Sequence, residues 1–588
     1  MVLLTVFLWP YLVDGYRFGV GPDVPVYLWW TRVGAAEGLS WVGSRPGAPA
    51  LAAALAGTLN LDVAAVTAGL ASALGVAVGA AAAALARAAG GRAWWLAGLL
   101  AGIFSVHLVA GYLGNLVLVV GFLAAAACLA GERRRWGAAA MLLAGGGLAH
   151  LPFLLVGIVI LLGAAALAWL GGARDEARDT VLAATAGGLA AGAGVLATVA
   201  GPGPIDAPTS KDAYLRRAGL DRVLVDAYRE RFRLRAARYV QWIAVPLAIP
   251  GAWFEAGGFL RRFLAAWLVV TAVAVPLGWI TGWFPPDRMV TFGFAVPIAA
   301  ALGLLWLRAR LRSRRVLGWL AVVALAGWMI VGALLAWGRQ EPFVSQREAE
   351  AAWSAMLRAS DRAASEHRPI VVVVDDADAT ATFFGARAAN ILRAAAPPSA
   401  ADDLSVFVGR VSDLLAGHPT VRKDAQFDAL SRITFEAIPT GTEPLVIVIA
   451  PFYRGPDPSG GGALREQEPG IWASDDLPEV SVASGGLAGL GFGPSSGLAI
   501  SSVTIGILVV LGILGLGYAS AAFADAVTYV ATAPAFGAAG LTIAAVSLDR
   551  LGLRLQNLGV AIASAVLTGL GGLAVFLVQR QRDRQAAA

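Results

Sequence analysis

Hydrophobic positions along the chain gather in long apolar runs that are separated by short polar loops. Most runs approach or exceed about 18 residues, and a helix of that length crosses a hydrocarbon core of about 30 Å. Only 14% of the residues are charged, against about a quarter in soluble domains. The predicted spans are 1–13, 62–86, 93–109, 111–130, 136–150, 152–170, 181–200, 239–256, 263–283, 289–307, 316–338, 500–523, 527–547 and 557–578. The pattern predicts an all-α polytopic membrane protein with about 14 transmembrane helices.

Most of the positive charge lies in loops on one side of the predicted membrane. The net charge is +6, but the basic residues are spread between apolar runs, so we expect no nucleic-acid partner. The clusters that share one side are 87 and 92, 133–135, 174 and 178, 261 and 262, 308–315, and 580–584. The positive-inside rule makes that side cytoplasmic. Abundant Ala, Gly and Arg indicate a GC-rich bacterial genome, and we expect the bacterial cytoplasmic membrane.

Three polar segments fall outside the cytoplasm in this topology, at 14–60, 201–238 and 340–496. Within the second, residues 211–238 place apolar side chains among arginines. This pattern is typical of an amphipathic helix, and we expect it on the outer membrane surface or against a partner loop.

The third polar segment predicts a small α/β domain. Apolar, β-branched runs at 369–374 and 444–450 predict strands, and helical stretches are expected at 341–366 and 402–415. The predicted organisation is a transmembrane module over 1–339, an inserted extracytoplasmic α/β domain over 340–496, and C-terminal transmembrane helices over 497–588.

The first external segment holds the residues best suited to chemistry. Asp14 and Asp23 lie just beyond the first span, and 24–32 predicts an aromatic amphipathic helix resting at the membrane interface. A partly desolvated carboxylate at that depth can act as general base on an acceptor hydroxyl. The alternative is that both carboxylates cap helices at the water boundary.

Several short motifs resemble those of membrane glycosyltransferases of the GT-C type, which use polyprenyl-phosphate sugars. The resemblance rests on residues within 1–340, namely 14–32, 44–47, 111–115, 148–152 and 285–288. It implies a GT-C-like transmembrane module and an acidic catalytic base in the first loop, which would be Asp23 or, second, Asp14. Asp23 is followed by Val24 and not by a second acidic residue, so the branch of the family and the need for a divalent cation are left open.

A lipid-linked phosphate requires cationic or polar partners. Arginine suits this role because its guanidinium stays charged and binds phosphate with two N–H groups. Arg288 is the first choice and Arg32 the second, while His150 and Tyr112 are further candidates for the donor phosphate. The alternatives are that Arg288 reaches lipid head groups at a span boundary and that His150 is a structural hydrogen-bonding residue.

Together, these features predict the transfer of a sugar from a polyprenyl-phosphate donor to an envelope glycan, lipid or protein acceptor. The chain contains no P-loop, H-E-x-x-H, C-x-x-C or G-x-S-x-G motif, which argues against a P-loop ATPase and against several hydrolase classes. Two other classes compete with this hypothesis. One is a transporter or lipid flippase, and the other is a non-catalytic envelope-assembly scaffold.

Overall fold

The protein is largely helical, with one small sheet near its C-terminal third. The computed structural model describes residues 2–17, 19–20, 24–43, 45–92, 94–109, 111–131, 135–199, 221–239, 242–311, 314–337, 355, 358–360, 362–363, 365–374, 406–410, 420–423, 436–437, 443–449, 464–477 and 495–587. All structural statements below concern these residues.

Most of the described residues up to Trp337 are helical. The helices of this part are α1 (Val2–Leu12), α2 (Val24–Ala36), η1 (Leu39–Val42), α3 (Gly47–Leu59), α4 (Val63–Ala88), α5 (Trp94–Phe104), α6 (Val106–Val109), α7 (Leu113–Ala130), α8 (Trp136–Ala149), α9 (Leu151–Leu170), α10 (Arg174–Val199), α12 (Asp221–Tyr239), α13 (Ala244–Pro250), η2 (Gly251–Glu255), α14 (Gly258–Thr281), α15 (Asp287–Thr291), α16 (Ala295–Arg310) and α17 (Arg315–Trp337). The chain closes with α22 (Gly497–Ala522), α23 (Ala526–Arg550) and α24 (Leu558–Ala587).

Eight of the described helices are long and apolar enough to cross a membrane, which supports a polytopic membrane protein. They are α4, α7, α9, α10, α14, α22, α23 and most of α24. In α4 and α7 the most apolar window is 89% and 94% buried, so these two helices form the centre of the bundle. In α14 only 28% of the most apolar window is buried. Its exposed apolar side chains face the region that a bilayer would fill.

Two predicted features of the helical part differ from the structure. The span expected at 239–256 is broken into α13 and the π-helical turn η2, and together these are shorter than a full crossing. The first external segment also contains α3, an apolar helix that the hydropathy windows did not predict and whose residues Gly47–Gly57 are buried.

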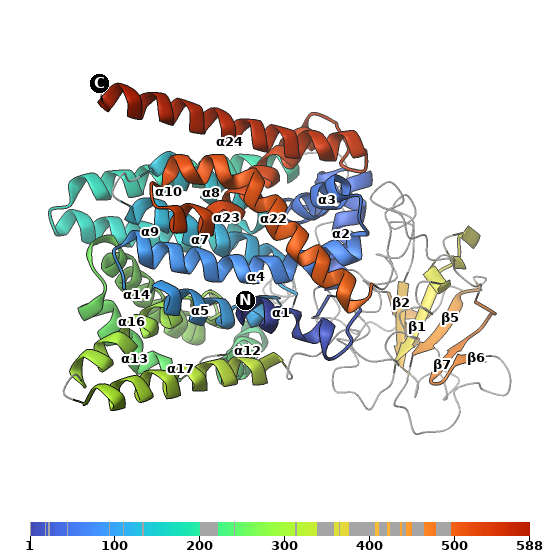
Figure 1. Ribbon diagram of the computed structural model, residues 1–588. Helices are drawn as coiled ribbons and strands as arrows, with labels where there is room; N and C mark the ends of the chain where they lie inside the picture. The colour runs from blue at the N-terminus through green and yellow to red at the C-terminus, as the bar shows by residue number, and fades with distance from the viewer. Residues whose placement is uncertain are drawn as a thin grey trace.

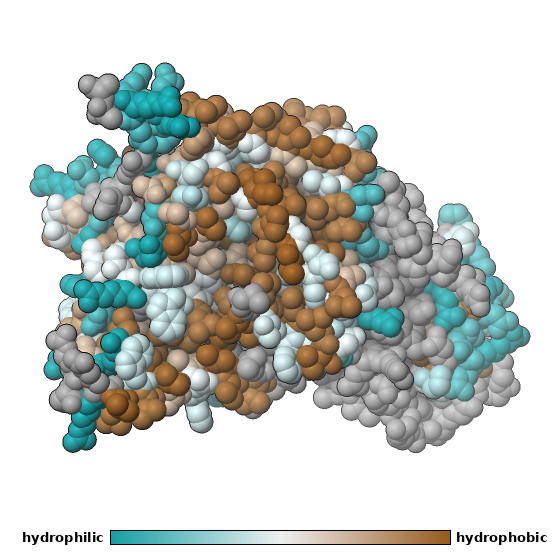
Figure 2. All heavy atoms as spheres, in the orientation of Figure 1, coloured by the Kyte–Doolittle hydropathy of each residue, from teal (hydrophilic) through white to brown (hydrophobic). Residues whose placement is uncertain are grey.

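The two ends of the bundle hold different sets of loops. At one end, Arg87 pairs with Asp525, and Arg262 pairs with Glu176. At the other end, the N–H of Ser495 donates to the Arg17 carbonyl at 3.0 Å. The arginine-rich C-terminus of α24 lies at the first end, whereas α2 and α3 lie at the opposite end (Figure 1). Hydrophilic side chains mark the first end and apolar side chains cover much of the length between (Figure 2).

The sheet lies beyond the end of the bundle formed by α2, α3 and the start of α22 (Figure 1). Its strands are β1 (Ile370–Val374), β2 (Val406–Arg410), β3 (Thr420–Lys423), β4 (Glu436–Ala437), β5 (Leu445–Ile449), β6 (Arg465–Glu468) and β7 (Ile471–Ala473). The strand order is β4-β3-β2-β1-β5-β7-β6, with β1 parallel to both β2 and β5.

The strands predicted near 370 and 445 correspond to β1 and β5, but the helical stretch predicted at 402–415 is wrong at its centre. Residues Val406–Arg410 form β2, which pairs in parallel with β1 from Ile370↔Val406 to Val374↔Arg410. Val406, Phe407 and Val408 favour a strand, and the pairing with β1 outweighs the local helical pattern.

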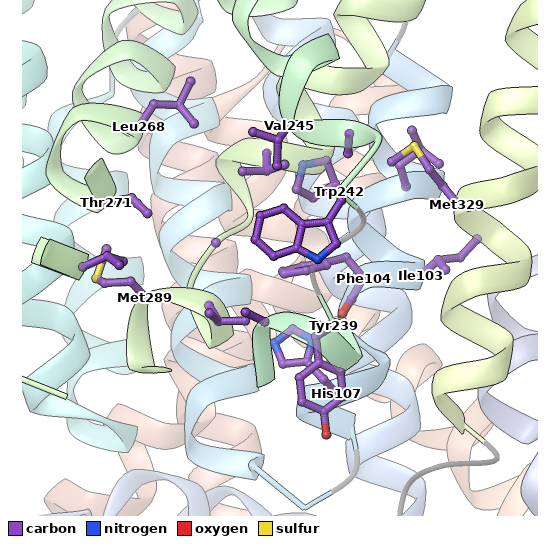
Figure 3. A pocket seen from close by; sticks show the side chains of 18 of the residues that line it. Ile103, Phe104, His107, Tyr239, Trp242, Val245, Leu268, Thr271, Met289 and Met329 are labelled. Atoms are coloured by element: carbon purple, nitrogen blue, oxygen red, sulfur yellow. Dashed lines mark hydrogen bonds between the residues drawn. The ribbon is translucent and has the colours of Figure 1, made fainter. Parts of the chain in front are cut away.

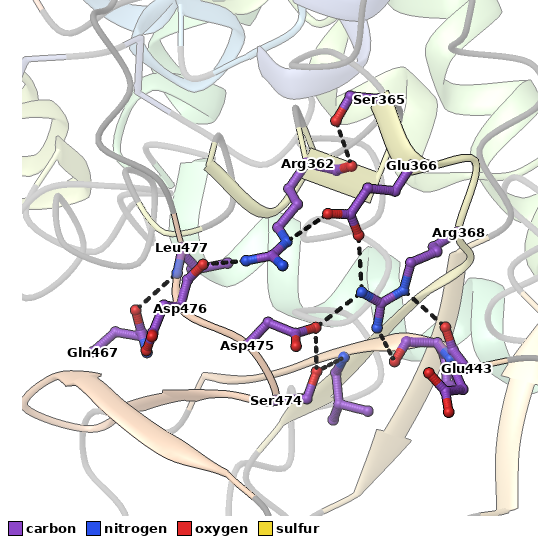
Figure 4. Close-up of polar contacts among 12 residues, drawn as sticks. Arg362, Ser365, Glu366, Arg368, Glu443, Gln467, Ser474, Asp475, Asp476 and Leu477 are labelled. Carbon is purple, nitrogen blue, oxygen red and sulfur yellow. Dashed lines mark hydrogen bonds and ion pairs between the residues drawn. The ribbon is translucent and has the colours of Figure 1, made fainter.

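An ion-pair network closes the sheet at the N-terminal ends of β1 and β5 (Figure 4). Arg368 pairs with Glu366 at 2.9 Å and with Asp475 at 3.0 Å. Its guanidinium also donates to the carbonyls of Glu443 at 2.9 Å and Pro444 at 3.3 Å. Arg368 lowers the pKa of the Glu366 carboxyl below its usual value. One arginine therefore joins the ends of three segments that are distant in sequence.

Candidate functional site

The structure brings together the first loop and the turns before α7 and α9, which are distant in sequence. Tyr27 of α2 reaches the first turn of α7, where its hydroxyl accepts the backbone N–H of Gly114 at 3.0 Å. Gly114 in turn packs against the carbonyl of Ala149, and a Cβ on Gly114 would lie 2.8 Å from that oxygen. The contact therefore depends on glycine at this position.

The Arg45–Gly47 segment also packs against Ala149. A Cβ built on Gly47 would lie 2.5 Å from the backbone nitrogen of Ala149, so any larger residue would push the loop away from α8. Arg45 stands two residues before this contact. Close packing of Gly47 against Ala149 thus brings the Arg45 charge to the neighbourhood of His150.

His150 is the centre of the cluster and lies between α8 and α9, not within either helix. Its side chain is buried, and its Nδ1 accepts the N–H of Phe153 at 3.2 Å. This bond leaves the ring proton on Nε2. Burial, together with the positive charges of Arg45 and Arg288, holds the pKa of His150 well below its usual value. A neutral imidazole with an N–H at Nε2 is therefore flanked by two cations.

Arg288 enters the cluster from α15, a single helical turn between two longer helices. Its backbone N–H donates to the Pro285 carbonyl at 3.0 Å, and Pro286 caps the turn. The Arg288 side chain is half-buried. Among the described residues, no carboxylate pairs with Arg288 or with Arg45. Two partly buried guanidinium groups beside a neutral histidine favour an anionic ligand.

A second polar group, which the sequence analysis did not identify, fixes the same turn. Arg235 of α12 pairs with the fully buried carboxylate of Asp287 at 2.8 Å and donates to the Tyr112 hydroxyl at 2.9 Å. Its guanidinium also lies over the Tyr112 ring at 5.6 Å. The arginine-rich pattern of 211–238 marked α12 as a charged surface helix, and no local pattern identified Arg235 as the partner of a residue more than fifty positions away.

An apolar cavity of about 310 Å³ borders α15 on its other side. Met289 and Val290, which directly follow Arg288, line it together with side chains from α5, α6, α12, α13, α14, α16 and α17. Trp242 lies among the lining residues, with Tyr239 and His107 grouped at one end (Figure 3). The Nε2 atom of His107 lies 3.1 Å from the Thr291 carbonyl of α15. One short turn therefore carries a cation toward His150 and apolar side chains toward a cavity.

Of the other predicted site residues, Tyr112 precedes α7 at the edge of this cluster, whereas the rest lie apart from it or outside the described residues. Arg32 is buried in α2, and its pKa is lowered to about 10 by burial, against the opposing charge of Asp62 at the start of α4. Asp14 follows α1, and desolvation by the surrounding protein raises its pKa. Asp23, the first choice for the base, lies outside the described residues. Tyr112 contacts Arg235, as described above.

The prediction that 24–32 rests on the membrane interface is wrong for its central residues. Tyr27, Leu28 and Trp29 are buried, with relative exposures of 3%, 1% and 1%, so α2 is enclosed by protein. Aromatic side chains fit a tightly packed core as well as an interface, and the pattern alone does not separate the two.

Within the described parts of the chain, no group of three His, Cys, Asp or Glu residues comes together as a set of cation ligands. The acidic run at 375–378 matches a D-x-D cation-binding pattern, but Asp residues at the end of a strand more often form a turn, and the run lies outside the described residues. No protein-family model matches the chain, and no curated protein matches it.

Proposed function

We propose that the protein is a membrane glycosyltransferase of the GT-C type, which moves a sugar from a polyprenyl-phosphate donor to an extracytoplasmic envelope acceptor. The proposal rests on two observations: the charges of Arg45 and Arg288 act on the buried His150, and the two residues that follow Arg288 line an apolar cavity. A phosphate joined to a long apolar chain needs cations and an apolar cavity side by side. The turn α15 provides both, because Arg288 is followed directly by Met289 and Val290.

The proposed reaction is a single displacement at the anomeric carbon. The acceptor hydroxyl attacks this carbon, and the bond between it and the phosphate oxygen breaks, with the electron pair leaving on the phosphate. Asp23 takes the hydroxyl proton as general base, and the configuration at the anomeric carbon is inverted. Arg288 and Arg45 stabilise the negative charge on the departing phosphate, and the Nε2–H of His150 donates a hydrogen bond to it.

The proposed topology places this reaction outside the cytoplasm. It includes about 14 crossings, with the shorter apolar helices counted, and the sheet segment 340–496 on the same side as α2 and α3. The arginine-rich end, with Arg87 and Arg262, would then face the cytoplasm under the positive-inside rule. The membrane would be the bacterial cytoplasmic membrane.

Donor turnover in nanodiscs tests the proposal. Purified wild type, Asp23→Asn and Val275→Trp proteins would receive radiolabelled polyprenyl-phosphate sugars, with envelope extract as acceptor. We expect wild-type transfer, loss of transfer in Asp23→Asn because the base is removed, and weakened donor use in Val275→Trp because an indole fills the cavity that Val275 lines. Val273→Trp is the matched control, since Val273 lies on the same helix but is 61% exposed.

The outcomes separate the competing functions. Equal transfer by wild type and Asp23→Asn would remove Asp23 from the mechanism and leave Asp14 as the candidate base. Binding of polyprenyl phosphate without transfer from any donor, together with movement of labelled lipid between leaflets, would favour a flippase. Absence of donor binding in the wild type would contradict the proposal and favour an assembly scaffold.

A further inference from the structure

The last turn of α23 and the loop that follows it bind the chain around the end of α2, which is distant in sequence. The Oδ2 atom of Asp549 accepts the backbone N–H of Leu39 at 3.1 Å, across 510 positions of sequence. In the loop, the N–H of Gln556 donates to the Ala35 carbonyl at 2.9 Å. These two bonds attach the C-terminal helices to both ends of the segment 35–39, just upstream of Arg45.

The Asp549 carboxylate is itself held in place. It is fully buried and pairs with Arg550 through Oδ2 and with Arg554 through Oδ1, the latter at 3.2 Å. The Arg554 guanidinium lies against Gly38, whose φ of +116° favours glycine and where a Cβ would stand 2.6 Å from Nη1. The backbone conformation therefore favours glycine at position 38, and the Arg554 guanidinium fills the space beside it.

Arg45 stands between two fixed points. Upstream, η1 begins at Leu39, which is bound to Asp549, and ends at Val42. Downstream, Gly47 packs against Ala149, next to His150. A connection this short limits the positions that Arg45 can take, so a shift of η1 would move Arg45 relative to His150.

We propose that Asp549 is a positioning residue, which holds Arg45 toward His150 through the Leu39 contact. Its importance for catalysis rests on the proposed function, whereas its effect on Arg45 does not. The sugar donor would not touch Asp549. Removal of its carboxylate would release η1, widen the range of Arg45 and weaken its action on the bound phosphate.

The titration of His150 reports the Arg45 position without any substrate. Histidine side chains labelled with ¹³C would be followed by NMR in nanodiscs; the chain has four, and His150→Asn assigns the signal. Arg45→Gln should raise the His150 titration midpoint by about one pH unit, because a nearby positive charge is lost. Asp549→Ala should also raise the titration midpoint of His150. The double variant should show no greater rise than Arg45→Gln alone, because Asp549 acts through Arg45.

Two further variants sharpen the test. Asp549→Asn keeps an oxygen that accepts the Leu39 N–H and should give a smaller rise than Asp549→Ala. Asp525→Asn removes an interhelix carboxylate just before the other end of α23, where its partner is Arg87, and should leave His150 unchanged. Should Asp549→Ala fail to fold, Arg554→Gln keeps the carboxylate, loosens its support and should raise the midpoint.

The inference would be overturned if folded Asp549→Ala left the His150 midpoint unchanged. It would also be overturned if the rise in the double variant equalled the sum of the rises in Asp549→Ala and Arg45→Gln. Activity gives a separate result. If wild type transfers sugar, Asp549→Ala should lower kcat/KM for the donor about 10-fold, with unchanged folding. If His150 responds as expected but wild type transfers no sugar from any donor, the positioning role stands and the proposed function fails.

Discussion

Two arginines at each end of the helical bundle differ in the groups that they meet. At the end that holds Arg87 and Arg262, each of these side chains meets a carboxylate through two short bonds, from 2.6 to 2.8 Å. At the opposite end, Arg45 and Arg288 approach the neutral His150, and no carboxylate among the described residues pairs with either. Paired charges stabilise contacts between helices, whereas unpaired, partly buried cations retain attraction for an external anion. The comparison thus separates charges that hold the fold from charges available to a ligand.

The largest effect is expected from removing both unpaired arginines. Arg45→Gln combined with Arg288→Gln should weaken binding of polyprenyl phosphate about 1,000-fold, because each loses a charge-assisted contact in a partly desolvated site. Binding of the sugar-free lipid phosphate to nanodisc-embedded protein measures this. Arg233→Gln is the control, since Arg233 lies near the same end but is 67% exposed and pairs with Glu230. Similar weakening in the control would mean that general surface charge, and not the cluster, attracts the lipid.

A smaller effect should follow from breaking the Arg262–Glu176 ion pair at the opposite end of the bundle. Glu176→Gln leaves Arg262 without its carboxylate between α10 and α14, which should lower the free energy of unfolding by about 3 kcal/mol. Denaturant unfolding in mild detergent measures the loss. Asp175→Asn is the matched control on the same helix, because the Asp175–Arg178 pair is exposed and contributes little. If Glu176→Gln binds polyprenyl phosphate like wild type, the division between structural and ligand-binding charges holds.

The smallest effect is expected for the more exposed Arg87–Asp525 pair. Arg87 and the Thr528 hydroxyl hold the pKa of Asp525 well below its usual value. A depressed pKa in the folded state stabilises the protein fully above the ordinary carboxyl pKa of about 4, and this contribution is lost as the pH falls toward the depressed value. The difference in thermal midpoint between wild type and Asp525→Asn should be small and constant above about pH 5, shrink below that, and also shrink in high salt. A difference that grows on acidification would contradict the assignment.

The sequence predicted regular elements better than it predicted their contacts. The windows at 62–86 and 111–130 correspond closely to α4 and α7, because hydropathy is a property of a local window. The buried helix α3 was missed because its short, small-residue sequence resembles a loop next to longer runs. The strand β2 was predicted as helix because its pairing with β1 is not visible locally.

The candidate site shows the same limit. Arg288 and His150 could be nominated because each has suitable chemistry for a phosphate and lies in a short motif at a span boundary, but Arg235 and Asp287 were missed. Their pairing joins α12 to α15, and neither helix shows a pattern that identifies the other. Arg32 was nominated by residue type, yet its side chain is buried in the bundle, where Asp62 supplies an opposing charge. Residue type alone could not distinguish an arginine within the core from one beside His150.

The sequence by itself determined that this chain forms many apolar helices, that an α/β segment lies between the last helices and the rest, and that arginine-rich loops alternate with other loops. These features follow from composition within short windows and from the cost of placing polar groups in lipid. Tertiary structure alone decided which arginines meet carboxylates and which meet His150, and that Asp549 holds the segment before Arg45. Such contacts join residues up to 510 positions apart, so they depend on how helices pack and not on any local pattern.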